Sequence, residues 1–242
     1  MTTRAEFLTR IRAQMAKTSG RFASQTAARS AHPEEAADLV RRQLAERWRE
    51  TVEVFRTEFE RVGGVFHRVG GHADVPPVIA RLARERDTSD LVAWHPGPMR
   101  ADFRAELSAA GLRTNVAPMD GTDADRRAMR AAAAAAGLGV SGVDLAIAET
   151  GTLVLRSGPG RPRSTSLLPP CHVAVFDPTR LVETLEQAGI FLEEWHAADT
   201  PGANVNFITG PSRTADIELT LTRGVHGPKE VHAIFVEGGL HG

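Results

Sequence analysis

Apolar side chains recur at helical spacing between Pro33 and Arg61, with arginine and glutamate filling most of the positions between them. This spacing predicts a long amphipathic helix over that range. Pro33 suits the first turn of a helix, Glu34 suits the positive end of the helix dipole, and Gly63 supplies a stop. The residues before this helix are polar and show only a weak helical pattern, so they predict an arm or a short helix.

After residue 63 the pattern changes to short apolar segments separated by amphipathic stretches. Strands that alternate with helices predict a three-layer α/β/α fold with a mostly parallel sheet. Two closely spaced strands around Gly151 predict that the sheet is mixed and holds at least one hairpin. We therefore expect an N-terminal helical extension over 1–62 and a single α/β domain over 63–242. The predicted strands are 65–69, 91–94, 114–116, 143–148, 152–155, 172–176, 204–208 and 231–236, and the predicted helices after residue 63 are 76–86, 99–110, 123–136, 179–188 and 214–222.

The charge balance narrows the range of partners. The chain has 29 basic and 30 acidic residues, so its formal net charge is −1. That balance argues against nucleic acid or an anionic membrane surface as the partner of the whole chain. No apolar run approaches the roughly 18 residues of a membrane span. The N-terminus carries charge early and lacks the apolar region of a secretory signal, so we expect a cytoplasmic protein with no membrane span.

Cys171 is the only cysteine. One thiol cannot form an intrachain disulfide, and an iron–sulfur cluster needs about four thiolates. Zinc or copper sites built on several thiolates are excluded in the same way. Because the segment around Cys171 carries no cationic feature beyond His172, we expect an inert thiol.

The first loop that could carry chemistry is Glu149-Thr150-Gly151-Thr152, directly after a predicted strand. It combines one carboxylate, two hydroxyls and a glycine that permits close approach of a ligand. Glu149 could act as an acid, a base or a nucleophile. Alternatively, the segment is an ordinary hairpin in which the threonines close the turn and Glu149 pairs with an arginine.

The second loop is the segment 210–218, which follows an apolar strand and opens a predicted helix. Free N–H groups at the start of a helix attract anions, and Ser212, Arg213 and Thr214 add hydroxyls and a guanidinium. The segment could therefore cradle a carboxylate or a phosphate. The alternative is a normal helix cap, with Asp216 and Glu218 satisfying the helix dipole.

The third loop is the segment 224–230, in which Gly227-Pro228 predicts a tight turn that presents His226 and Lys229. Histidine is suited to proton transfer near neutral pH, although a lone histidine is also common at a surface. No pair of histidines has metal-ligand spacing, so no metal site is expected. The Gly/Pro/Arg-rich segment 156–164 could be a lid on the same side as Glu149, or simply a solvated loop.

Taken in order, the segments AIAETGTLVL, SLLPPCHVAV and GPSRTADIELTLTRGVHGPKEVHAIFV resemble the LUD-domain family. The resemblance covers roughly residues 60–237. It implies the fold shared by NagB, RpiA and the CoA transferases, and a role in oxidising L-lactate to pyruvate. It also implies two partner subunits that carry iron–sulfur clusters, whereas this chain would bind no cofactor itself.

From these observations we expect an accessory subunit that handles a carboxylate substrate at the carboxyl edge of the sheet. Arg213 would clamp the carboxylate and His226 would take the proton of the 2-hydroxyl group, with Glu149 orienting the substrate or sharing that task. Because no dinucleotide-binding fingerprint is present, we expect no catalysis by the isolated chain. The remaining site residues would be Thr150, Gly151, Thr152, Ser212, Thr214 and Lys229.

Two alternatives remain open. The first is a stand-alone enzyme, transferase-like or isomerase-like, acting on an anionic metabolite. The related CoA transferases use a glutamate in a Glu-x-Gly turn, which Glu149-Thr150-Gly151 resembles. However, Thr150 replaces the common asparagine and no CoA-binding signature follows. The second alternative is an architectural subunit whose three loops form an interface and bind no small molecule.

Overall fold

The computed structural model describes residues 3–17, 32–198, 204–215 and 221–240. The chain divides into two units, residues 1–31 and 32–242, and the first unit contains α1 (Arg4–Lys17). The second unit opens with α2 (Pro33–Arg61), whose bounds are those that its apolar spacing predicts. Within the described ranges, no helix is both long and apolar enough to cross a lipid bilayer.

Six strands of the second unit form one sheet in which every pair of neighbours is parallel. A parallel sheet is covered on both faces, which accounts for the continuous apolar runs of its central strands. Five of the six strands match predicted segments. In spatial order the sheet contains β1 (Val65–Val69), β12 (Glu230–Val236), β7 (Cys171–Phe176), β4 (Leu138–Gly142), β2 (Asp90–Ala93) and β3 (Arg113–Val116).

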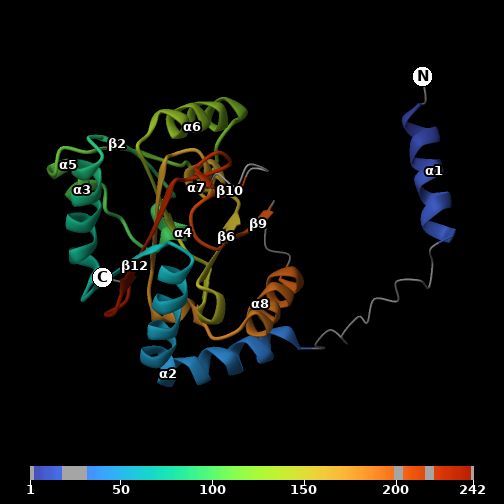
Figure 1. The fold of residues 1–242 in the computed structure, drawn as a ribbon, viewed down its shortest axis with the longest axis horizontal. Coiled ribbons are helices and arrows are strands. Elements are labelled where there is room, and N and C mark those ends of the chain that lie inside the picture. The colour runs from blue at the N-terminus through green and yellow to red at the C-terminus, as the bar shows by residue number, and fades with distance from the viewer. Residues whose placement is uncertain (1–2, 18–31, 199–203, 216–220, 241–242) are drawn as a thin grey trace. The chain divides into compact units, whose positions relative to one another are not determined.

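Helices pack on both faces of this large sheet. On one face, Phe55 and Phe59 of α2 share a buried cluster with Phe176 and Phe235 of the strands. On the other face, α6 packs Met129 against β2 and the segment after β3, and Figure 1 shows the strands lying between α6 and α2. The helices beside the large sheet include α3 (Val75–Glu85), α5 (Arg104–Ala109), α6 (Asp123–Ala135) and the short α7 (Ser164–Leu167).

A second, four-stranded sheet is built around the predicted hairpin. Its strands β5 and β6 are antiparallel and are joined by a turn that contains Gly151. The first half of α2 covers this small sheet together with α8, because Val40 and Leu44 pack against Phe191 and the strands. The order is β8 (Leu181–Val182), β5 (Leu145–Ile147), β6 (Thr152–Ser157) and β9 (Asn204–Ile208), and α8 spans Leu185–Ala197.

One central strand escapes the sequence pattern. β4 contains two glycines and was not predicted, whereas the strand predicted over 143–148 corresponds to β5, which belongs to the other sheet. Gly139 is required there because an added Cβ would lie 1.8 Å from the carbonyl oxygen of Thr165 in α7. The glycine that weakens the strand signal is therefore what allows the helix to pack.

Three predicted helices are wrong in whole or in part. The helix over 99–110 is interrupted at Arg100, which adopts a left-handed conformation between α4 (Pro96–Met99) and α5. The helix over 179–188 is replaced by the short η3 (Pro178–Arg180), β8 and the start of α8, because the Thr184 side chain caps a helix that begins one residue later.

The predicted helix over 214–222 is also wrong. The described parts of this segment are the antiparallel strands β10 (Arg213–Ala215) and β11 (Leu221–Arg223), and residues 216–220 lie outside the described residues. The segment alternates apolar and polar residues and is rich in threonine, which favours strands.

These observations confirm an α/β fold with helices on both faces of a parallel sheet. The antiparallel hairpin belongs to a separate sheet, whereas a single mixed sheet was expected. The likeness to the NagB, RpiA and CoA transferase fold stays a prediction, as does the division of the chain into 1–62 and 63–242. The structure itself divides the chain after residue 31, since α2 contributes side chains to both cores of the second unit.

Candidate functional site

Two of the three candidate loops meet the C-terminal end of α2. The turn after β5 touches the helix at Gly151, where an added Cβ would lie 2.3 Å from the amide nitrogen of Phe59. The loop after β9 touches it at Gly210, where an added Cβ would lie 2.5 Å from the carbonyl oxygen of Val62. Both glycines have positive φ, so each allows a turn and a close approach that another residue would hinder.

A chain of hydroxyl groups connects these two loops. Thr150 donates to Thr152 through side-chain oxygens 2.8 Å apart, and the Thr152 hydroxyl lies 2.8 Å from that of Thr209. Thr152 is buried, so its hydrogen-bond partners fix the spacing between the loops. The threonines thus close the turn, as the structural alternative predicted, and they also join two loops that are 57 residues apart in sequence.

The third candidate loop wraps around Ser212. The backbone N–H of His226 donates to the Ser212 hydroxyl at 3.3 Å, and the backbone N–H of Ser212 donates to the carbonyl of Pro228 at 3.0 Å. The backbone N–H of Gly224 donates to the Ser212 carbonyl at 3.0 Å. All three predicted loops therefore form one connected group, which we call the loop junction: residues 148–152, 209–213 and 224–229.

The loop junction lies at the amino edge of the large sheet, and the expected position at its carboxyl edge is wrong. Val62 precedes the first residue of β1, and the N–H groups of Lys229 and Glu230 donate to the carbonyl of Pro170, just before β7. The first two candidate loops follow β5 and β9, which belong to the small sheet. They therefore do not lie at the carboxyl edge of the large sheet. Glu149 does follow a strand end, but that strand is β5.

The charged side chains of the loop junction contact two different helix ends. Glu149 is exposed, and its Oε1 accepts a hydrogen bond from the N–H of Leu185 at 2.5 Å, the first residue of α8. A carboxylate at this position complements the positive end of the helix dipole. Arg213 is also exposed, and its guanidinium donates to the Val62 carbonyl at the end of α2, where carbonyls lack helical partners.

Three further predicted site residues are His226, Lys229 and Thr214. His226 and Lys229 are exposed on their loop, and the Lys229 stem packs beside Gly224. The backbone of Thr214 belongs to β10, but its side chain lies outside the described part of the chain. The structure thus brings the three loops together. That Glu149, Arg213 and His226 face a common cleft stays a prediction.

A cluster of ionisable groups next to the third loop was missed by the sequence analysis. His67 Nε2 lies 3.0 Å from His232 Nδ1, and their rings stack with centroids 5.3 Å apart. Arg86 binds the Glu230 carboxylate and lies 3.1 Å from His232 Nε2. The residues come from β1, β12 and the end of α3, so only the pairing of parallel strands brings them together.

The buried Cys171 belongs to the same cluster. Ligand atoms of Cys171, Glu230 and His232 all lie within 4.8 Å of one another, which is a spacing that a metal ion could use. However, the Arg86 guanidinium already contacts Glu230 and His232 and supplies a positive charge there. Burial raises the pKa of the Cys171 thiol to about 12, so it is neutral at physiological pH and the expected inert thiol is supported.

Burial also keeps two histidines of the large sheet neutral. The pKa of His172 falls to about 3 because the ring is fully buried beside Ser141, and the pKa of His67 falls to about 4 through burial and the neighbouring His232. An unfolded chain takes up these protons near pH 6.5. Stability that is present above this pH is therefore lost as the pH falls toward the folded pKa values.

We accordingly expect His172 to account for about 2 kcal/mol of the stability lost between pH 7 and pH 5. His172→Gln should remove this contribution and flatten the dependence of the free energy of unfolding on pH, measured by urea denaturation at both pH values. His226→Gln, which changes an exposed histidine, should leave the dependence as it is in the wild type. Equal pH dependence in His172→Gln and the wild type would contradict the assignment.

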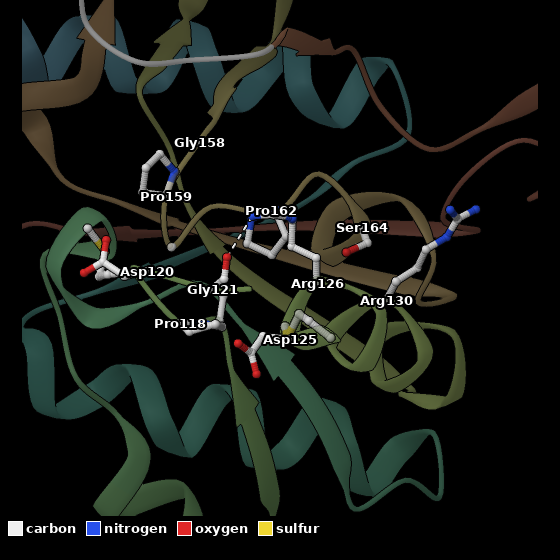
Figure 2. A pocket seen from close by; sticks show the side chains of 14 residues that line it. Pro118, Asp120, Gly121, Asp125, Arg126, Arg130, Gly158, Pro159, Pro162 and Ser164 are labelled. Atoms are coloured by element: carbon white, nitrogen blue, oxygen red, sulfur yellow. Dashed lines mark hydrogen bonds between the residues drawn. The ribbon is translucent and has the colours of Figure 1, made fainter. Parts of the chain in front are cut away.

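The segment 156–164 lies away from Glu149, so the interpretation of this segment as a lid on the same side as Glu149 is wrong. β6 runs antiparallel to β5, which places the segment after it at the open end of the hairpin, opposite the Glu149 turn. There the N–H of His95 donates to the carbonyl of Gly160 at 2.8 Å. Figure 2 shows Pro159 and Pro162 lining a cavity of about 560 Å³, with Arg126 from α6 beside them.

Comparison with known proteins gives one family. The sequence profile described as the LUD domain matches residues 52–236. A protein of Exiguobacterium named Lactate utilization protein C is 32% identical over 98% of this chain and 96% of its own length. A protein of the same name from Halalkalibacterium halodurans is 39% identical over 66% of this chain and 67% of its own length.

A Bacillus licheniformis protein of that name is 37% identical, and its alignment spans 54% of this chain and 58% of the relative. Among solved structures, a DUF162 family protein from Deinococcus radiodurans has a TM-score of 0.53 and 18% identity. That likeness covers 78% of this chain and 98% of the other. At this identity the structural likeness supports the α/β fold and nothing finer.

Proposed function

The chain belongs to the LUD domain family, and we propose that it is a subunit of a protein system that oxidises L-lactate to pyruvate. The names of its relatives support a role in lactate utilization. Within that system we assign this chain to binding the carboxylate substrate. The observation that carries the assignment is the loop junction, which gathers polar groups from three distant segments at the end of α2.

Electron transfer belongs to partner subunits in this proposal. Oxidation of a 2-hydroxy acid releases two electrons and two protons, and an acceptor must take up the electrons. The chain has one thiol, Cys171, which is buried and protonated, whereas an iron–sulfur cluster needs about four thiolates. Iron–sulfur clusters would therefore be held by partners, and this chain would bind no cofactor.

Arg213 would clamp the substrate carboxylate in this proposal. A guanidinium has five N–H donors in a rigid fork, and the contact with the Val62 carbonyl uses only one Nη atom. That contact orients the side chain, while its exposure leaves the other donors accessible to a carboxylate. Ser212, the residue before Arg213, adds a hydroxyl group that accepts the backbone N–H of His226, while Thr150 and Thr152 hold the first loop against Thr209.

His226 would accept the proton of the substrate hydroxyl group. Its exposed imidazole is placed by the backbone hydrogen bond to Ser212, and Lys229 on the same loop adds a positive charge that favours an anionic substrate. Glu149 would act as a positioning residue, since its carboxylate holds the start of α8 against the turn. The chain's own contribution is then to bind, orient and remove one proton.

We expect Arg213→Ala to raise the KM for L-lactate about tenfold to a hundredfold in the reconstituted system with its partner subunits, because one charge-assisted hydrogen-bonded contact is lost. Arg213→Lys should recover only part of this, since an ammonium group lacks the planar fork. Steady-state lactate oxidation gives both constants. Arg163→Ala, which changes an exposed arginine outside the loop junction, is the matched control.

An unchanged KM in Arg213→Ala would overturn the clamp. A smaller fraction of assembled complex by size-exclusion chromatography, with an unchanged KM in the complex that remains, would instead favour an architectural subunit whose loops form an interface. Melting curves of each variant show whether loss of the Val62 contact has destabilised the chain. Lactate oxidation by the isolated chain would contradict the accessory role.

A further inference from the structure

The carboxyl edge of the large sheet, opposite the loop junction, holds a second group of charged side chains. Asp144 follows β4 and is 6% exposed. It accepts hydrogen bonds from the backbone N–H of Arg156 at 2.7 Å, from Arg156 Nε at 3.2 Å and from Arg161 Nη1 at 3.0 Å. Both arginines are largely buried, and the Arg156 guanidinium lies 4.0 Å from the centre of the Trp195 ring. One carboxylate thus serves two buried guanidinium groups.

A second buried carboxylate is already engaged nearby. Asp177 follows β7 and is 1% exposed. Its Oδ1 accepts from the N–H and hydroxyl of Thr179, and its Oδ2 accepts from the N–H of Leu240 and lies 3.6 Å from Arg100 Nη1. We treat Asp177 and Arg100 as a balanced pair.

Arg180 is not matched in this way. Among the described residues, no carboxylate oxygen lies within ion-pair distance of its guanidinium. Burial lowers the pKa of Arg180, and the neighbouring Arg100 and Arg156 lower it further, while Asp144 and Asp177 act in the opposite direction. A largely buried cation that faces other cations is costly unless an anion accompanies it.

Arg180 lines a cavity of about 530 Å³ between α2, α8 and the segment after β7. Arg41 and Arg100 line the same cavity, and none of the described residues that line it is acidic. The charge of Arg41 is balanced outside the cavity by a bidentate contact with Glu194. The remaining walls are largely apolar and are formed mainly by Leu44, Trp48, Leu181 and Phe191.

A charge count indicates what the cavity lacks. The buried groups of this edge, Arg156, Arg161 and Arg180 against Asp144, carry an excess of two positive charges, and of these groups only Arg180 lines the cavity. A phosphoryl group with two negative charges and three terminal oxygens can bind two guanidinium groups at once, which suits Arg180 and Arg100 on the cavity wall.

We propose that this cavity binds an organic phosphate monoester, with its phosphoryl group between Arg100 and Arg180 and its apolar part against Trp48 and Phe191. The volume accommodates a phosphoryl group together with a body the size of an aromatic ring. The site is separate from the loop junction, since it lies at the opposite edge of the large sheet. It therefore goes beyond the lactate-binding role and can succeed or fail independently of it.

Calorimetric titration of the full chain with three probes tests the proposal. Phenyl phosphate carries two charges at pH 7.5, benzenesulfonate has the same ring and a similar tetrahedral head with one charge, and inorganic phosphate lacks the ring. We expect phenyl phosphate to bind on the order of tenfold more tightly than either of the others. Equal affinity for phenyl phosphate and benzenesulfonate, or no binding of phenyl phosphate, would overturn the proposal.

Two variants assign the binding to the cavity. Arg180→Gln should weaken phenyl phosphate binding about tenfold or more, and it should leave the melting temperature of the free protein unchanged or higher, because an uncompensated cation is removed. Arg104→Gln changes an exposed arginine that pairs with Asp102 outside this cavity and should bind as the wild type does. Wild-type affinity in Arg180→Gln would overturn the assignment, as would equal losses in both variants.

Discussion

Asp144→Ala should lower the free energy of unfolding by about 3–5 kcal/mol, because it leaves two largely buried guanidinium groups without their carboxylate. Arg156 and Arg161 both donate to this side chain, and Asp144 also accepts the backbone N–H of Arg156 between the two sheets. Urea denaturation monitored by circular dichroism measures the change. A fall in Tm of roughly 10 °C should accompany it in a chain of this size.

Asp123→Ala is the matched control for this substitution. Asp123 also pairs with an arginine, Arg126, but both side chains are exposed on the first turn of α6. An exposed pair of this kind contributes at most about 1 kcal/mol. Similar losses in the two variants would show that burial does not set the strength of the Asp144 contacts, and the charge count at the carboxyl edge would then lose its basis.

Gly151→Ala should be nearly as destabilising, by about 2–4 kcal/mol. Gly151 has φ +58°, and an added Cβ would lie 2.3–2.6 Å from backbone atoms of Glu58 and Phe59, which belong to a helix and cannot move aside. The loss therefore has a conformational part and a steric part. Thermal and urea unfolding of the purified variant measure their sum.

Gly111→Ala separates these two parts. Gly111 has φ +82°, but an added Cβ there meets no atom within 4 Å, so this variant carries the conformational cost alone, about 1 kcal/mol. A clearly larger loss in Gly151→Ala is expected. Equal losses would mean that the turn does not press against α2, and that the first two loops of the junction are held together in some other way.

The sequence predicts those helices and strands whose buried side chains follow a regular pattern within one segment of the chain. The apolar positions of α2 give its bounds, and the buried runs of β2, β7 and β12 give their strands within a residue or two. β4 fails this test because its two glycines remove the side chains that produce a pattern. The helix predicted over 214–222 is wrong because the segment alternates apolar and polar residues and is rich in threonine, which favours strands.

The residues of the candidate site could be predicted from the sequence, but their arrangement could not. The loops that carry Glu149, Arg213 and His226 could be selected from sequence, because turn glycines and polar residues after apolar strands are local signals. Their joint position at the amino edge of the large sheet could not, since it depends on which strands belong to which sheet. Local sequence patterns likewise do not predict the group formed by Asp144, Arg156, Arg161 and Arg180. Its members become neighbours only when the sheets assemble.

One helix connects the two regions to which this chain's chemistry is assigned. α2 places Arg41, Leu44 and Trp48 on the wall of the arginine-lined cavity, and its last turn ends at Val62, which holds Arg213. The helix is continuous over its 29 residues, and Figure 1 shows that it bends between its two halves. The arginine-lined cavity and the carbonyl that orients Arg213 therefore both depend on the position of one continuous element of the fold.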